Sequence, residues 1–472
     1  MRLFRAGVLS PTFIALCLQG APEENSPRVT STVRIVRKTE PAVAAVFSQA
    51  EGRLNMGSGS VVHEDGFVLT NDHVVAGLPG VILLKDQKLP LKYRIVGRMP
   101  EKDLCLLKVD SEEDLQSIKL GNSHDLMTGE PILCAGNPGG RGVVYSAGIV
   151  SSPNFILGAP NALVMHYFSG DVRDRFIQFD AASNQGNSGG PLINALGEQV
   201  GVVSNKNYAE ENINFAIPID RVRSNLGQLF APEVRKNFYS GISLDPLAAD
   251  PKVLSVAKGS PADKSGIHEH DLITDLNGKP INGYVDWLAE LMNFEKNATM
   301  KLSLLRKGKR LKTELQLAAY PLLPTKNLEK PKPGLLFQVC HGRFEKAPNF
   351  ERQEVIKKGT TKSLDVLAIA APLKDDFAIS FKGFLKVPES GVFRMILNSD
   401  DGSLLRIGEK VIVDNDGPHP AQDVGTLVRL QKGYTPIRID YFEATGDAEL
   451  SFFLEDASGQ RQSAENFLFH EG

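Results

Sequence analysis

Short apolar segments recur through residues 36–231, and turn-forming Gly, Asn and Asp residues separate them. Segments this short, rich in Val, Ile and Leu and bounded by turn residues, are typical of β-strands. Their regular spacing predicts an all-β barrel or sandwich. The segments are 59–63, 66–70, 81–85, 104–109, 131–135, 148–151 and 200–204.

The periodicity changes at residues 234–318, where it predicts two strands, a helix and two more strands. The strands are expected at 252–256, 271–276, 300–306 and 312–317, and the helix at 284–294. A shorter helix is expected at 260–266, because Ser stands at its cap, Pro at its first position and Gly at its end.

Residues 319–334 are rich in proline and lysine and predict a stiff, solvated linker. Between residues 335 and 457 a period-two alternation returns and predicts a β-sandwich. With 472 residues the chain is too long for one core. The predicted fold class is therefore mainly β and multidomain, with domains at 36–231, 234–318 and 335–457.

The stretch 176–191 runs from a strand-like segment into Gly186-Asn187-Ser188-Gly189-Gly190. Glycines on both sides of Ser188 allow the backbone to turn tightly and to approach a substrate closely. Successive backbone N–H groups can then point at one developing oxyanion. The same residues could also form an ordinary tight turn, so a nucleophile needs a base and an acid elsewhere.

A histidine and an aspartate stand in settings that suit such a pair. His73 ends a strand-like segment, and Asp103 directly precedes the apolar strand at 104–109. A carboxylate at the mouth of a buried strand needs a partner, because an unpaired buried charge is costly. The order His, Asp, Ser is that of the trypsin-like triad and differs from subtilisins and α/β-hydrolases.

Seven segments of this region match the HtrA/Deg serine proteases in order and spacing, so the region resembles that family. They are Gly57-Ser58-Gly59-Ser60, Leu69-Thr70-Asn71-Asp72-His73-Val74-Val75, Asp103-Leu104-Cys105-Leu106-Leu107-Lys108-Val109, Gly136-Asn137-Pro138-Gly139-Gly140, Ala147-Gly148-Ile149-Val150-Ser151, Gly186-Asn187-Ser188-Gly189-Gly190-Pro191 and Asn214-Phe215-Ala216-Ile217-Pro218. The resemblance implies a trypsin-like double β-barrel of six strands each, with the site in the cleft between the barrels.

The resemblance also implies a role for each site residue. Ser188 attacks the scissile carbonyl, His73 takes its proton and returns it to the leaving amine, and Asp103 orients His73. The backbone N–H groups of Gly186 and Ser188 hold the oxyanion, with Asn187 in the same loop.

The pocket for the residue before the cleaved bond, P1, can be partly inferred. Trypsin-like enzymes that cut after Lys or Arg carry Asp six residues before the nucleophile, where this chain has Ala182. A small or apolar P1 residue is therefore expected. Ser183 replaces the aliphatic residue of close relatives and leaves the P1 preference open. Residues 153–175 are longer than expected and form either an altered regulatory loop or a plain surface insertion.

The second domain resembles an HtrA-type PDZ domain, through Gly259-Ser260-Pro261-Ala262 and the later Asn277-Gly278 turn. The resemblance implies a loop whose backbone donors bind a peptide C-terminal carboxylate while the peptide adds as a strand. The loop residues are Tyr239, Ser240, Gly241 and Ile242. The alternative is a module that only packs against the protease.

The third domain resembles the protective-antigen-type module. The matching segments are Gly383-Phe384-Leu385-Lys386-Val387-Pro388-Glu389-Ser390-Gly391-Val392-Phe393, Ser399-Asp400-Asp401-Gly402-Ser403, Val413-Asp414-Asn415-Asp416-Gly417 and Pro436-Ile437-Arg438-Ile439-Asp440-Tyr441-Phe442-Glu443. Members often bind carbohydrate, and some hold calcium through an Asp pair, here Asp400 and Asp401. The same Asp-Asp-Gly sequence is also a good turn, whose carboxylates bind loop N–H groups. Catalysis itself is expected to need no cofactor.

The N-terminus predicts export. Arg2 and Arg5 precede a mostly apolar run at 6–18, and small residues follow, an order typical of a signal peptide, here 1–21. A short buried helix, or lipidation at Cys17, is the alternative. A periplasmic or extracellular location is therefore expected.

Three cysteines remain after the signal peptide, and two lie in strand-like runs, which predicts buried thiols and no disulfide framework. They are Cys105, Cys134 and Cys340. The formal net charge of −3 gives no electrostatic footprint for nucleic acid, so no nucleic-acid partner is expected.

The sequence thus favours an exported serine endopeptidase that cleaves misfolded or exposed proteins. Its PDZ domain would bind C-terminal peptides, and its third domain would bind surface carbohydrate. Family resemblance implies a homotrimer built on the protease domain. The alternatives are a non-enzymatic glycan- or peptide-binding scaffold on a protease fold, against which the intact triad argues, and a narrow processing protease with one partner substrate.

Overall fold

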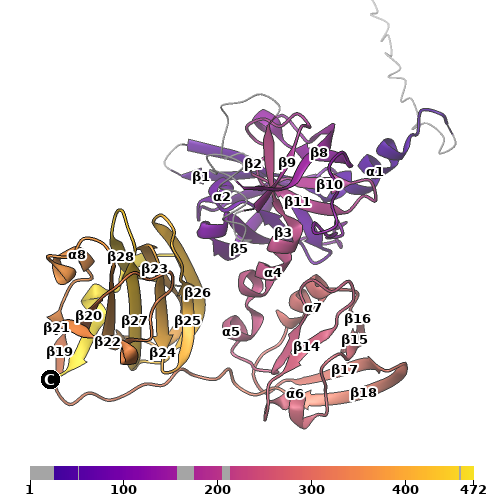
Figure 1. The fold of residues 1–472 in the computed structure, drawn as a ribbon. Coiled ribbons are helices and arrows are strands. Elements are labelled where there is room, and N and C mark those ends of the chain that lie inside the picture. Colours follow the sequence, from indigo (N-terminus) through magenta and orange to yellow (C-terminus); the bar gives the residue numbers. More distant parts are fainter. Residues whose placement is uncertain (1–25, 51–52, 157–174, 205–212, 457–458) are drawn as a thin grey trace, which may run out of the picture.

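The computed structural model describes residues 26–50, 53–156, 175–204, 213–456 and 459–472. The predicted signal peptide, Cys17 and most of the 153–175 stretch lie outside these residues. Two β-barrels, a smaller mixed domain and a β-sandwich follow one another along the chain (Figure 1), which confirms the predicted mainly β, multidomain fold class.

The first domain consists of two closed six-stranded barrels, which settles the choice between barrel and sandwich. All neighbouring strands of both barrels are antiparallel. In barrel order the first contains β1 (Val43–Ala50), β2 (Arg53–His63), β3 (Phe67–Thr70), β6 (Leu104–Val109), β5 (Leu91–Met99) and β4 (Gly80–Leu83). The second contains β10 (Pro191–Asn194), β11 (Gln199–Val203), β12 (Asn214–Pro218), β9 (Arg175–Phe179), β8 (Val144–Ile156) and β7 (Pro131–Gly136).

Short helical elements connect these strands and lead out of the barrels. They are α1 (Ser31–Thr39), η1 (Glu40–Ala42), α2 (Asp72–Val75), η2 (Pro100–Lys102), η3 (Pro138–Gly140), α4 (Ile219–Phe230) and α5 (Pro232–Lys236). The three predicted thiols, Cys105, Cys134 and Cys340, are all buried and unbridged, as expected.

The second domain places its strands and helices close to the predicted positions. In chain order these are β13 (Ile242–Leu244), β14 (Val253–Val256), α6 (Pro261–Lys264), β15 (Leu272–Leu276), β16 (Lys279–Pro280), α7 (Tyr284–Leu291), β17 (Thr299–Arg306) and β18 (Lys309–Gln316). The predicted cap of the short helix is present, since Ser260 Oγ accepts the N–H of Asp263 at 3.2 Å.

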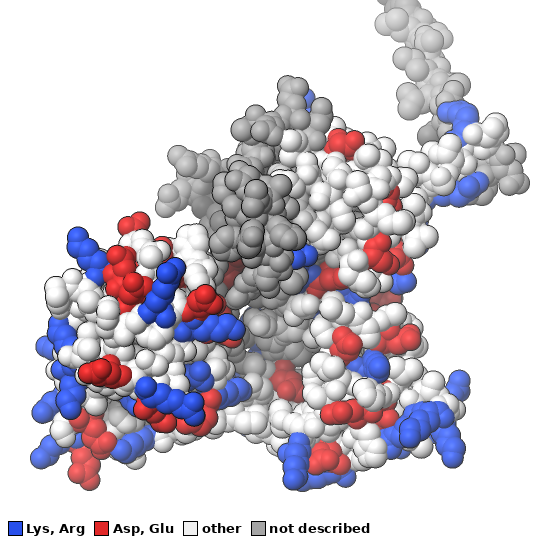
Figure 2. All heavy atoms as spheres, in the orientation of Figure 1, with Lys and Arg blue, Asp and Glu red and all other residues white. Residues whose placement is uncertain are grey.

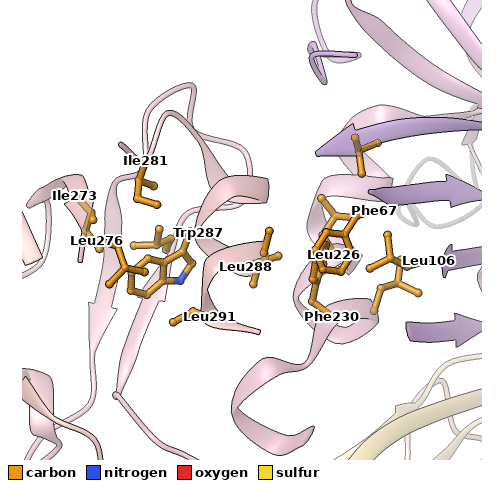
Figure 3. Packing of buried hydrophobic residues seen from close by; sticks show 14 of the residues in the cluster. Phe67, Leu106, Leu226, Phe230, Ile273, Leu276, Ile281, Trp287, Leu288 and Leu291 are labelled. Carbon is orange, nitrogen blue, oxygen red and sulfur yellow. The ribbon is translucent and has the colours of Figure 1, made fainter. Parts of the chain in front are cut away.

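Helix α4 joins the first barrel to the second domain through a shared core. Its residues Leu226 and Phe230 are fully buried and lie beside Phe67 of β3 on one side and helix α7 on the other (Figure 3). This approach requires Gly97 in β5, because a Cβ there would lie 2.1 Å from the carbonyl oxygen of Leu229. The first two domains are therefore held together by continuous apolar packing.

The C-terminal domain is a sandwich of two antiparallel sheets around one apolar core. The larger sheet contains β19 (Pro331–Pro333), β30 (Leu468–Glu471), β22 (Phe377–Val387), β27 (Gly433–Glu443), β24 (Ser403–Ile407) and β25 (Lys410–Asn415); β20 (Leu335–His341) also pairs with β22, and β21 (Val355–Thr361) pairs with β20. The smaller contains β26 (Gln422–Leu430), β23 (Gly391–Asp400), β28 (Glu449–Glu455) and β29 (Arg461–Ser463). The remaining elements are α8 (Val366–Ala370), η5 (Phe350–Arg352) and η6 (Glu465–Phe467).

The linker differs from the expected solvated connector. Leu323 packs against the sandwich core, Lys326 pairs with Tyr434, and β19 pairs with β30. The prolines of β19 are tolerated because this strand lies at the sheet edge. Strand β30 also lies beyond residue 457, so the sandwich begins earlier and ends later than the predicted 335–457.

The C-terminal domain packs against the first domain through polar contacts. Arg394 of β23 donates to Glu101 of η2 at 2.5 Å, and these side chains are only 8% and 2% exposed. Arg429 of β26 donates to the carbonyl oxygen of Val234 in α5 at 3.1 Å. The third domain is therefore docked and not merely tethered.

Acidic and basic side chains are interspersed over the second and C-terminal domains on the face drawn in Figure 2. Within the part of the chain that the structure describes, every helix is too short or too polar to traverse a bilayer.

Candidate active site

The one-turn helix α2 carries His73 directly after strand β3. Its neighbour Asp72 is bound by both arms of Arg98, with Nε donating to Oδ1 at 2.7 Å and Nη2 to Oδ2 at 2.9 Å. Such two-pronged charged contacts fix orientation as well as adding energy. The His73 side chain is 41% exposed, so a substrate can reach it from solvent.

Asp103 lies at the end of η2 and is almost completely buried. Its backbone is left-handed, with φ 53° and ψ 42°. This conformation is uncommon for residues other than glycine, although Asp tolerates it, and such positions cluster at functional sites. The turn is supported by Asn71, whose Nδ2 donates to the carbonyl oxygen of Asp103 at 2.9 Å.

The carboxylate of Asp103 faces the ring of His73. Its Oδ1 lies 2.8 Å from Nδ1 and accepts the backbone N–H of His73 at 3.2 Å. Its Oδ2 lies 3.0 Å from Nδ1 and accepts Ser204 Oγ at 3.1 Å. Because an ionised carboxylate only accepts, it holds the proton on Nδ1 and leaves Nε2 free to act as a base.

Ser188 lies in the loop between β9 and β10. The backbone N–H of Ser58 in β2 donates to the Ser188 carbonyl oxygen at 2.8 Å, and Ser58 Oγ donates to the Gly186 carbonyl oxygen at 2.6 Å. Gly189 is required here, since φ is 84° and a Cβ would lie 2.2 Å from the Ser58 carbonyl oxygen. Contacts from the first barrel thus hold the loop that carries Ser188, the predicted nucleophile.

The histidine and serine segments meet at Gly57 of β2. A Cβ at Gly57 would lie 2.5 Å from Val74, the residue after His73, and 3.1 Å from the Ser188 carbonyl oxygen. No hydrogen bond joins Ser188 Oγ to the His73 ring among the described contacts. In the absence of substrate this bond is often long, and it tightens when substrate binds.

The three residues predicted for the oxyanion hole lie in one turn but differ in their bonding. The N–H of Asn187 donates to the Asn184 carbonyl oxygen at 3.0 Å. Within the described residues the N–H groups of Gly186 and Ser188 have no acceptor. Asn187 therefore shapes the turn, while the other two N–H groups can donate to an oxyanion.

The two residues predicted for the P1 pocket, Ala182 and Ser183, come shortly before this loop in the chain. Ala182 is exposed, and its carbonyl oxygen accepts Ser146 Oγ of β8 at 2.6 Å. Burial raises the pKa of the Cys134 thiol to about 12, against hydrogen bonds from Ser183 and Ser146 that lower it. Ser183 is therefore turned toward a buried neutral thiol, and neither pocket residue brings a charge.

Sequence analysis missed two supporting residues. The sequence alone assigns no role to Ser58, although its position between Gly57 and Gly59 is a signal of close backbone approach. Ser204 follows the strand-like segment of β11 and carries no local signal, because its contact with Asp103 spans 101 residues.

The four predicted PDZ residues form one loop. Tyr239 pairs with Ala318, its N–H donating at 2.8 Å. Gly241 has φ of 79°, and a Cβ there would lie 2.2 Å from Ser260 Cβ. The N–H of Ser240 donates to Glu233 Oε1 at 2.9 Å, whereas the N–H of Ile242 donates to Ser240 Oγ at 3.2 Å. Glu233 was not predicted to have a role.

The acid pair of the C-terminal domain gains a third member. Oxygen atoms of Asp400, Asp401 and Glu443 lie within 4.8 Å of one another. Asp401 also accepts the N–H groups of His419 at 3.2 Å and Ala444 at 2.7 Å. Burial, and then the charge of Asp401, raise the pKa of Glu443 to about 8. Asp401 thus stabilises the loop by accepting backbone N–H groups, and its charge also repels the nearby carboxylate of Glu443.

Three parts of the chain match known protein-domain families. Residues 57–202 match the trypsin-like peptidase domain, residues 239–317 the PDZ domain and residues 331–465 the PA14 domain. The PA14 match lies over the predicted protective-antigen-type module.

Related proteins were found in several bacteria. A probable periplasmic serine endoprotease DegP-like of Pseudomonas putida (strain W619) is 35% identical over 283 residues, covering 57% of this chain and 56% of that protein. A protein of the same description from Bartonella henselae is 30% identical over 303 residues, covering 61% and 57%. The crystal structure of the serine endoprotease from Yersinia pestis matches at 26% identity and a TM-score of 0.36, covering 62% of this chain and 98% of that one.

The chain thus spans little more than half the length of these DegP-like relatives. The chain is similar to DegP-like serine endoproteases over this part, and it carries matches to a trypsin-like peptidase domain, a PDZ domain and a PA14 domain in one polypeptide.

Proposed function

We propose that this chain is a serine endopeptidase of the HtrA type that hydrolyses peptide bonds through an acyl-enzyme on Ser188. The observation that carries the proposal is the bonded pair of His73 and Asp103, joined at 2.8 Å beside a loop in which two backbone N–H groups have no acceptor among the described residues. A structural histidine would not need an exposed ring together with a buried carboxylate.

Each group has one task in the proposed reaction. His73 Nε2 takes the proton of Ser188 Oγ as this oxygen attacks the carbonyl carbon, and later gives it to the leaving amine. Asp103 holds the ring and stabilises its charged form. The N–H groups of Gly186 and Ser188 hold the oxyanion, and each such donor is typically worth about 10²–10³ in kcat.

The proposed substrates are unfolded or exposed protein segments with a small or apolar P1 residue. Ala182 and Ser183 support this preference, because neither offers a counter-charge to Lys or Arg. The relatives described as periplasmic support export and a periplasmic location. We also propose that the chain forms a homotrimer and acts in the periplasm. The loop 239–242 of the PDZ domain is proposed to bind C-terminal peptides.

A fluorophosphonate probe tests the enzyme against the scaffold alternative. We expect the purified chain to be labelled on Ser188, the label to be absent in Ser188→Ala, and peptides with Val or Ala at P1 to be cut faster than those with Lys. An unlabelled but folded chain that binds glycans would favour the scaffold. Cleavage of one native protein but not of unfolded casein would favour the narrow processing protease.

We further propose that the PA14 domain binds carbohydrate and holds calcium at Asp400, Asp401 and Glu443. Oxygen ligands suit Ca²⁺, and Glu443 Oε1 is buried without a partner among the described residues. Adding about 1 mM Ca²⁺ is then expected to raise the melting temperature of the domain. If Ca²⁺ raised the melting temperature of Asp400→Asn equally, or did not raise that of the parent chain, the acids would serve only to stabilise the turn.

A further inference from the structure

We propose that Glu233 is an internal ligand of the carboxylate-binding loop, and that a peptide C-terminus binds the PDZ domain only by displacing it. The inference rests on the proposed peptide-binding role of the loop 239–242, which it deepens by naming the resident competitor.

The side chain of Glu233 bonds as a peptide carboxylate would. It projects from α5, and its Oε1 accepts both the N–H of Ser240 at 2.9 Å and Ser240 Oγ at 2.5 Å. Burial raises the pKa of this carboxyl, whereas hydrogen bonding to Ser240 and, least of all, to the Gly241 amide lowers it. Backbone and hydroxyl donors converging on one carboxylate are the means by which such loops capture a chain terminus.

The carboxylate of Glu233 has no cationic partner in the part of the chain that the structure describes. Among the described residues no Lys, Arg or His forms an ion pair with Glu233, and burial is the largest influence on its pKa, which is raised. Its charge in turn helps to raise the pKa of Tyr239 and of Tyr320, whose rings meet edge to face at 6.4 Å. A partly buried carboxylate without a cation needs strong donors, and the loop supplies them.

The groove beside the loop is covered by other parts of the same chain. A cavity of about 250 Å³ lies between β13 and α7, lined on the domain side by Ile242, Trp287 and Leu291. Its other wall comes from α4, α5 and Tyr320, together with Leu427 of the C-terminal domain. The apolar lining suits an apolar last side chain. Among the described strands β13 pairs only with β14, so its second edge can accept a peptide strand.

Displacement of Glu233 would reach beyond the PDZ domain. Glu233 and Val234 are consecutive in α5, and the carbonyl oxygen of Val234 accepts Arg429 of the C-terminal domain. A peptide that enters the groove must move α5 or its neighbours, and so disturbs a contact of the third domain. Peptide binding and docking of that domain are therefore coupled, and each opposes the other.

Peptide binding to the full-length chain tests the proposal, with Ser188→Ala as the background to prevent hydrolysis. The probe is an equimolar set of fluorescein-labelled peptides ending in Val, Leu, Ile or Phe, read by fluorescence polarisation. Because hydrogen bonds to a charged group are strong, Glu233→Ala is expected to tighten binding at least about tenfold. Glu233→Gln keeps an acceptor without the charge, so its affinity for the peptides is expected to lie between those of the parent and Glu233→Ala. Glu269→Gln changes an exposed position of the same domain and should bind the peptides as the parent does.

The outcomes separate this proposal from the function on which it rests. Free-carboxylate peptides that bind the parent as tightly as both Glu233 variants would overturn the internal ligand and leave the peptide-binding role standing. Binding by none of the chains, or equal binding of C-terminally amidated peptides, would overturn the peptide-binding role and the internal ligand with it. If Glu233→Ala fails to fold, the test uses Glu233→Gln, which preserves the shape of the side chain. Peptide binding by Glu233→Gln that is no tighter than binding by the parent then overturns the internal ligand.

Discussion

Replacing Asp103 by Asn is expected to lower kcat for peptide hydrolysis by about 10⁴-fold while KM changes little. The carboxylate accepts from His73 Nδ1, from the His73 backbone and from Ser204. A neutral amide cannot stabilise the charged imidazole, and in one of its two orientations it presents N–H to Nδ1. That orientation moves the ring proton to Nε2, where it blocks proton transfer from Ser188.

The matched control for this substitution is Asp110→Asn, at the far end of the same strand. The Asp110 side chain is 87% exposed and pairs only with Lys108 among the described ion pairs, so its loss should leave kcat near the parent value. Initial rates on a chromogenic peptide, normalised to folded protein by circular dichroism, measure both variants. If Asp103→Asn kept more than about a tenth of the parent rate, a different acid or a different base would carry the reaction.

The candidate catalytic groups could be picked out in the sequence because each one stands in a recognisable local context. Ser188 needs glycines beside it for close backbone approach, and Asp103 needs to stand at the mouth of a buried strand. Both demands are met by neighbours in sequence, and the fold class follows in the same way from short, evenly spaced apolar segments. The two closed barrels then bring the marked positions together.

The residues that were missed act across long sequence distances. Ser204 contacts Asp103, Glu233 enters the PDZ loop, and Glu101 meets Arg394, 293 residues away. In the sequence each of these looks like an ordinary solvated polar residue, because nothing nearby requires it. The prediction for the linker was wrong for a related reason. Its prolines indicated a stiff, solvated spacer, but Leu323 packs against the core of the C-terminal sandwich, which is distant in sequence.

Replacing Arg394 by Ala is expected to release the C-terminal domain from the protease domain, at a cost to docking of about 3–5 kcal/mol. Arg394 Nη2 donates to Glu101 Oε2 at 2.5 Å, and both side chains are almost fully buried at this contact. The loss of Arg394 leaves the Glu101 carboxylate buried and unpaired unless the domains separate. Small-angle scattering should show a larger radius of gyration, and proteolysis should become faster in the linker at 319–334.

The double variant Glu101→Leu with Arg394→Met distinguishes loss of charge pairing from loss of packing. Replacing a buried ion pair by apolar side chains of similar size is often neutral, so this variant should stay docked while Arg394→Ala does not. Arg343→Ala, at an exposed position of the same domain, serves as the control for an arginine lost elsewhere. Unchanged scattering and cleavage in Arg394→Ala would mean that other contacts suffice for docking. Glu101 lies two residues before Asp103. If Arg394→Ala both separates the domains and lowers kcat, docking also supports the turn that carries Asp103, the proposed catalytic acid.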